Sequence, residues 1–209
     1  LAQGTGGIYD ISCVGDSLTQ GAGDTAYNYV NQLNSSFLIN QTAYRYGVGG
    51  ESSGAIAKRL GGIHAFVQPF TIPANTDAVE IEIQDNMGNK IQYGAINGLL
   101  FGVSTSYING IQGTISVSPD FTHTYFTRTT AGSAIVIDRP TLLITDIMHN
   151  HKDDTFIIWA GTNDNIEVNG IENTFKNIDD MITFIGHNRY IVVGMTAYNN
   201  NMHDIDNIN

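Results

Sequence analysis

A serine that follows a short apolar run is the residue in this sequence best suited to covalent chemistry. Residues 8–14 are rich in apolar side chains, which is typical of a buried strand, and Gly15 then breaks the run. We therefore expect Asp16 and Ser17 at the carboxyl end of that strand, where open α/β sheets bind ligands. There a serine can offer both its hydroxyl and its backbone N–H to one carbonyl group, as acyl transfer requires. The alternative is that Asp16 and Ser17 form only a turn or a helix cap.

Two later segments carry groups that could hold a developing oxyanion. The first is Tyr-Gly-Val-Gly-Gly-Glu-Ser at 46–52, in which Gly50 can bring its backbone N–H close to a substrate. The second is Trp-Ala-Gly-Thr-Asn-Asp at 159–164, in which the Asn163 amide can donate a hydrogen bond. Taken alone, Gly50 favours a plain turn, and a helix cap or Asx turn is the commoner role for an asparagine such as Asn163.

The Gly15-Asp-Ser-Leu-Thr19 segment and these two segments together resemble, in order and spacing, the first three sequence blocks of the SGNH (GDSL-type) hydrolases. The resemblance implies that Ser17 is the nucleophile. It also implies an oxyanion hole made by the Ser17 N–H, the Gly50 N–H and the Asn163 side chain, with Asp164 bracing the loop. The texture of the middle of the chain is similar to inserts of SGNH-type esterase modules in bacteriophage tail fibres and tailspikes.

A nucleophilic serine needs a base, and members of this family supply a histidine from an Asp-x-x-His block near the end of the domain. The two matches in this sequence, Asp120 to His123 and Asp146 to His149, precede the Asn163 segment and are in the wrong order. His203 follows the last expected strand, but its spacing to the neighbouring aspartate fails. We assign no base within the chain. The expectation is that the histidine block lies beyond Asn209, and the alternative is a degenerate relative that has lost hydrolysis.

The resemblance and the apolar patterning predict a three-layer α/β/α flavodoxin-like sandwich with a parallel sheet and an inserted small antiparallel β domain. Residues 1–64 and 140–209 would form the α/β domain, and 65–139 the β-rich insertion, because alternating segments separated by turn clusters are typical of antiparallel strands. In the α/β part we expect strands at 8–14, 41–46, 155–160 and 190–195 and helices at 25–38, 55–60 and 171–185.

The composition narrows the range of partners. The 209 residues carry a formal net charge of −11, with 9 Lys and Arg against 20 Asp and Glu. This balance argues against nucleic acid and against anionic membranes as partners, because both require concentrated cations. The single cysteine, Cys13, cannot form an internal disulfide and is expected to be buried in the first strand. No cofactor or metal is expected, since no cluster of His, Cys and carboxylates has ligand spacing.

These observations and the resemblance together predict a serine esterase that removes acyl groups from a bacterial surface polysaccharide, in a virion tail or another extracellular setting. Three alternatives stay open. One is a lipid esterase of the same family, and another is a noncatalytic glycan-binding or receptor-binding module of a phage tail protein. The third is a structural domain of a trimeric fibre, and a tail fibre would make the chain part of a homotrimer.

Overall fold

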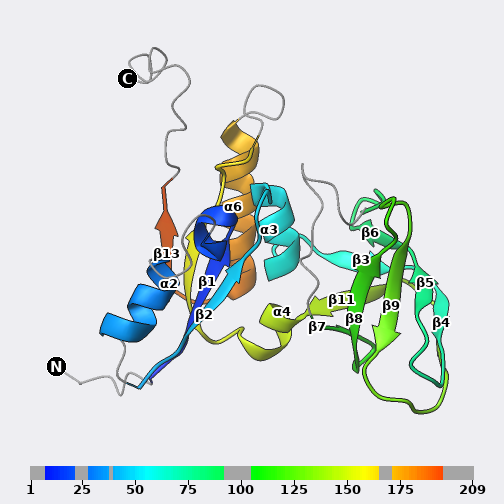
Figure 1. The fold of residues 1–209 in the computed structure, drawn as a ribbon. Coiled ribbons are helices and arrows are strands. Elements are labelled where there is room, and N and C mark those ends of the chain that lie inside the picture. The colour runs from blue at the N-terminus through cyan, green and yellow to red at the C-terminus, as the bar shows by residue number, and fades with distance from the viewer. Residues whose placement is uncertain (1–7, 22–27, 38–39, 92–104, 165–170, 195–209) are drawn as a thin grey trace.

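The chain forms two separate β-sheets of opposite character in a computed structural model that describes residues 8–21, 28–37, 40–91, 105–164 and 171–194. A four-stranded sheet is wholly parallel, and a seven-stranded sheet is antiparallel. The two occupy opposite sides of the molecule in Figure 1, with α4 between them.

The parallel sheet consists of four strands from both halves of the chain. Its order is β13-β12-β1-β2, with bounds Tyr190–Val193, Thr155–Trp159, Ile11–Gly15 and Ala43–Gly47. All four predicted strands are therefore confirmed, with ends shifted by a few residues. β1 is central and pairs with β12 on one side and β2 on the other, so the residues that follow these three strands emerge at the same edge of the sheet.

The helices pack chiefly against the parallel sheet. Their bounds are α1 Ser17–Gln20, α2 Tyr29–Gln32 with the π-helix η1 Leu33–Phe37, α3 Ser53–Leu60, α4 Asp146–Asn150 and α6 Ile171–Ile185. The apolar stripes of α3 and α6 share a core with β1 and β12, and both helices lie on one side of the sheet in Figure 1. The smaller core around Cys13 and Val30 joins α2 to β1 and β2.

Helix α3 shows how local sequence sets the boundaries of these elements. The Ser52 side chain caps its first turn by accepting a hydrogen bond from the Ala55 N–H at 3.4 Å. Gly61 ends it in the left-handed region, with φ of 106°, where a side chain would also meet the Phe184 ring. The predicted helices at 55–60 and 171–185 are thus confirmed. Of the helix predicted at 25–38, residues 28–37 are described and hold the shorter pair of α2 and η1.

The antiparallel sheet has the order β5-β9-β8-β7-β11-β3-β6 and is nearly barrel-like. The bounds are β3 Ala65–Val67, β5 Val79–Ile81, β6 Ile83–Asp85, β7 Thr105–Ile108, β8 Ile111–Val117, β9 Thr124–Arg128 and β11 Thr141–Thr145. A separate ribbon pairs β4 Phe70–Ile72 with β10 Ile135–Ile137. Side chains from both sheets of this region, including Ile72 and Phe126, enclose a single apolar core.

The prediction of a three-layer α/β/α flavodoxin-like sandwich is wrong. Among the described residues most strands belong to the antiparallel sheet, and the parallel sheet is the smaller of the two main sheets. The antiparallel part is not a small insertion on a large α/β domain. The antiparallel sheet also includes β11, which pairs with β3 and β7. The residues of β11, 141–145, lie beyond the end of the 65–139 segment. The physical reason is that β11 finds its partners far away in the chain, which local patterning does not reveal.

Two further predictions concern the ends of the chain and membranes. His203 and the polar stretch at 198–209 lie outside the described residues. Within the described parts of the chain, no helix has the length and apolar character needed to cross a bilayer.

The core of the antiparallel sheet provides a test of this arrangement. Phe126 on β9 has no exposed surface, and Phe121 in the loop before it is 50% exposed. Phe126→Ala is expected to lower the free energy of unfolding by about 3–5 kcal/mol, because it opens a cavity in a closed core. Phe121→Ala, the matched control, should change it by less than about 0.5 kcal/mol. Urea denaturation followed by circular dichroism measures both, and equal effects would contradict this placement of β9.

Candidate active site

Ser17 stands where the first strand gives way to the first helix. β1 ends at Gly15, and Asp16 caps α1 by accepting a hydrogen bond from the Leu18 N–H at 2.9 Å. Asp16 is fully buried, whereas Ser17 is partly exposed and Leu18 is 36% exposed beside it. Asp16 therefore stabilises the turn, and Ser17 lies at the carboxyl edge of the parallel sheet. The second carboxylate oxygen of Asp16 is buried without a partner among the described residues.

The glycine segment after β2 packs directly against this turn. The Val48 N–H donates to the Gly15 carbonyl at 3.0 Å. A Cβ atom at Gly47 would lie 2.0 Å from the backbone nitrogen of Gln20, so only glycine allows the two segments this close. A Cβ at Gly49 would lie 3.8 Å from the Cβ of Ser17. Gly49, which was not among the predicted site residues, thus lies close to Ser17.

Gly50 lies one residue beyond this contact, in the left-handed region with φ of 81°. The conformation turns the chain sharply between Gly49 and the buried Glu51. Gly50 therefore follows directly after the residue that contacts the Ser17 turn. The Gly50 N–H has no hydrogen-bond acceptor among the described residues, as a donor reserved for a substrate would require.

A buried ion pair between Glu51 and Arg59 holds the glycine segment in place. The Arg59 guanidinium on α3 donates to both Glu51 carboxylate oxygens, with a shortest N···O distance of 2.6 Å, and its side chain is 3% exposed. The same guanidinium donates to the Gly15 carbonyl at 3.1 Å. Burial raises the pKa of the Glu51 carboxyl, and the charge and hydrogen bonds of Arg59 oppose that rise. The sequence reasoning missed this pair. The available signal was an acidic residue within a glycine block and an arginine on the apolar side of the next helix.

Asn163 reaches the same segment from the end of β12. Its side-chain nitrogen donates to the Glu51 carbonyl at 3.0 Å. A carboxamide has two N–H bonds, so one remains for another acceptor. The neighbouring Asp164 accepts hydrogen bonds from the Ser53 N–H at 2.7 Å and from the Thr174 hydroxyl. Asp164 therefore braces the loop as predicted, and the Asn163 side chain is held in a fixed orientation.

The three predicted segments are thus joined by hydrogen bonds at one edge of the parallel sheet. The Gly15 carbonyl accepts hydrogen bonds from the Arg59 side chain and from the Val48 N–H, and the Glu51 carbonyl accepts one from the Asn163 side chain. The assignment of catalytic roles to Ser17, Gly50 and Asn163 stays a prediction.

Five of the six histidines are described, and none contacts the Ser17 hydroxyl. His64 packs edge-on against Phe66 and Phe184, His123 pairs with Glu80, His149 stacks on Tyr107, His151 pairs with Asp154, and His187 bonds with Lys152 and Arg189. Neither Asp-x-x-His match forms an internal pair. The Asp120 carboxylate accepts from the Ser118 hydroxyl, and that of Asp146 accepts from Tyr46 and Asn150.

A different Ser-Asp-His group is present, but its geometry does not suit nucleophilic catalysis. The Ser12 hydroxyl donates to Asp154 at 2.7 Å, and His151 pairs with the same carboxylate oxygen at 2.9 Å. Ser12 is fully buried and bonds to the acid and not to the histidine, so no base can take its proton. Asp154 also precedes β12, at the sheet edge opposite Ser17.

Comparisons with known proteins assign the chain to no family. No protein-family model, curated protein or solved structure matches the chain. Within the described parts of the chain, no group of three His, Cys, Asp or Glu side chains is arranged to hold a metal ion.

The buried ion pair leads to a prediction about stability. Glu51→Ala leaves the Arg59 charge buried without its carboxylate, and should lower the free energy of unfolding by about 3–5 kcal/mol. The control is Glu82→Ala, at an exposed position, which should cost less than about 0.5 kcal/mol. Chemical denaturation measures both, and a Glu51→Ala protein as stable as the control would contradict the anchoring role of the pair.

The His123 pair leads to a prediction about titration. The hydrogen bond and negative charge of Glu80, 2.7 Å away, raise the pKa of His123 above its ordinary value. The folded protein holds this proton more tightly than the unfolded chain, so the pair stabilises at low pH and loses its effect as pH rises through the raised pKa. Glu80→Gln should bring the His123 pKa down, whereas Glu82→Gln should leave it unchanged. NMR titration of the imidazole resolves the two cases.

Proposed function

We propose that the chain is a serine esterase in which Ser17 attacks the carbonyl carbon of an acyl ester on a carbohydrate. The observation that carries the proposal is the set of hydrogen bonds that joins the Ser17 turn, the glycine segment and the Asn163 loop. Nothing in the packing of the sheets alone requires an exposed hydroxyl, a fixed carboxamide and a glycine backbone to share one edge. An acyl-transfer site does require them.

The proposed reaction has two steps. The Ser17 oxygen bonds to the ester carbon, its proton passes to a base, and the carbonyl oxygen becomes an oxyanion facing the N–H groups of Ser17 and Gly50 and the free N–H of Asn163. The bond to the sugar oxygen then breaks, the sugar leaves with a proton from the protonated base, and an acyl-serine remains. Water attacks this ester in the same way and releases the carboxylic acid. The base must come from outside the described residues.

An acylated bacterial surface polysaccharide is the proposed substrate. The support is the similarity of the middle segment to inserts of phage tail esterase modules, which also favours a virion tail as the location. A noncatalytic glycan-binding module is the second candidate, and the observation that favours it is that no described histidine contacts Ser17.

Substitutions in the three segments test the proposal. Ser17→Ala should abolish release of acetate from an O-acetylated bacterial polysaccharide and from 4-nitrophenyl acetate by the full chain. Asn163→Ala should lower kcat by about 100- to 1,000-fold, the usual effect of losing one oxyanion donor. Circular dichroism should show that both variants are folded.

The control is Asn188→Ala, an exposed asparagine in the turn before β13, which should keep the parental rate. Acetate release that persists in Ser17→Ala would refute the esterase proposal. Polysaccharide binding by the parent chain without any acetate release would instead establish the glycan-binding module.

A further inference from the structure

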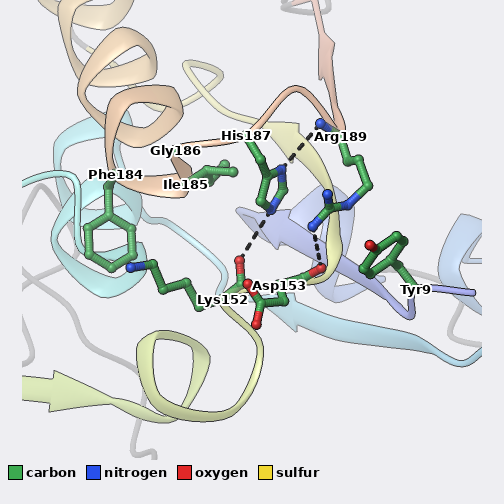
Figure 2. Close-up of a pocket in the computed structure, with 8 residues that line it drawn as sticks. All are labelled: Tyr9, Lys152, Asp153, Phe184, Ile185, Gly186, His187 and Arg189. Atoms are coloured by element: carbon green, nitrogen blue, oxygen red, sulfur yellow. Dashed lines mark hydrogen bonds between the residues drawn. The ribbon is translucent and has the colours of Figure 1, made fainter. Parts of the chain in front are cut away.

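A cavity of about 530 Å³ lies away from Ser17, and two cationic side chains and one carboxylate contribute to its lining. Its walls include the aromatic rings of Tyr9 and Phe184 and the side chains of Lys152, Asp153, His187 and Arg189 (Figure 2). The volume falls within the range of pockets that hold small ligands.

The cavity is at the amino edge of the parallel sheet. Tyr9, Asp153 and Arg189 each lie just before a strand, namely β1, β12 and β13, whereas Ser17 lies just after β1. A strand of five residues separates the two edges by about 16 Å. The cavity is therefore separate from the candidate active site.

Two cations in this cavity have no carboxylate partner among the described residues, although acidic residues outnumber basic ones by 20 to 9 in the sequence. The Lys152 ammonium lies 5.8 Å from the centre of the Phe184 ring and makes no hydrogen bond with the described residues. The Arg189 guanidinium lies 3.8 Å from the centre of the Tyr9 ring and, within the described parts of the chain, donates to the Asp153 carbonyl alone, at 2.8 Å. Its Nε is buried without an acceptor among the described residues.

His187 links the backbones of these two residues. The Arg189 backbone N–H donates to its Nδ1 at 3.2 Å, so Nε2 carries the proton and donates to the Lys152 carbonyl at 3.3 Å. In Figure 2 the imidazole stands between the Lys152 and Phe184 pair on one side and the Arg189 and Tyr9 pair on the other. Each cation thus lies against its own aromatic ring, and the imidazole joins the two chain segments that carry them.

We propose that this cavity binds an acidic sugar unit of the uronic acid class. The Arg189 guanidinium, whose shape matches a carboxylate, offers charge-assisted hydrogen bonds to the sugar carboxylate, and the Lys152 ammonium, on the other side of the imidazole, offers hydrogen bonds to hydroxyl groups of the same sugar. The Asp153 carboxylate has no side-chain partner among the described residues and accepts hydrogen bonds from sugar hydroxyls. A simple anion such as phosphate would gain nothing from Asp153, whose charge repels it.

Calorimetric titration of the full chain with D-glucuronate tests the site, with methyl glucoside as the neutral probe of the same ring. Glucuronate should bind at least tenfold more tightly than methyl glucoside. Lys152→Gln and Arg189→Gln should each weaken glucuronate binding at least tenfold. Lys176→Gln, which removes an exposed lysine paired with Asp180 on α6, should bind like the parent.

Asp153→Ala distinguishes a sugar site from a general anion site by the sign of its effect. Loss of a hydroxyl acceptor should weaken glucuronate binding, whereas at a general anion site removal of the negative charge would strengthen it. Tighter binding in Asp153→Ala, equal binding of inorganic phosphate and glucuronate, or an effect of Lys152→Gln no larger than that of Lys176→Gln would each overturn the proposal. Binding is read directly, so the result does not depend on the role of Ser17.

Discussion

The buried charge of Arg59 is the constraint on which the site depends. A guanidinium removed from water requires hydrogen-bond acceptors on all sides, and Arg59 obtains them from the Glu51 carboxylate and the Gly15 carbonyl. These acceptors belong to different strand ends, so satisfying one charge fixes the distance between the Ser17 turn and the glycine segment. The Glu51 backbone then receives the Asn163 amide, which brings in the third strand end. The position of the exposed hydroxyl is thus set by groups that never meet a substrate.

The elements of the parallel sheet could be predicted from sequence because their signals are local. β1 is a largely apolar run ended by Gly15, β12 is an apolar run followed by Gly161, and α3 and α6 have apolar residues at helical spacing. The overall architecture could not be predicted in this way. β3, β5 and β6 have three residues each, too few to show a period, and β11 joins β3 from more than seventy positions away. The size of the antiparallel sheet therefore depends on pairings between strands that are far apart in the sequence.

In the candidate site, too, some features could be predicted from local sequence and others depend on tertiary packing. The types of residue at Ser17, Gly50 and Asn163 could be recognised because each stands at the end of an apolar run, and parallel strands bring such ends to one edge. The contact of Gly49 with Ser17 and the pairing of Glu51 with Arg59 could not be predicted, because the first follows from how the glycine segment packs on α1 and the second from how α3 packs against that segment. Sequence patterns identify groups with chemical capacity, and tertiary packing decides which of them are exposed.

The two sheets are coupled through the same buried arginine. Thr145, the last residue of β11, donates its hydroxyl to the Arg59 carbonyl at 2.7 Å and also caps α4. In the first turn of α4, Asp146 accepts from the Tyr46 hydroxyl on β2 at 3.1 Å, and Ile147 enters the core shared by α3 and α6. The antiparallel sheet is thereby fixed next to the helix that carries Arg59, and α4 lies between the two sheets in Figure 1. Because one residue of α3 bonds both to the Ser17 turn and to the end of β11, a shift of either sheet relative to the other would disturb the candidate active site.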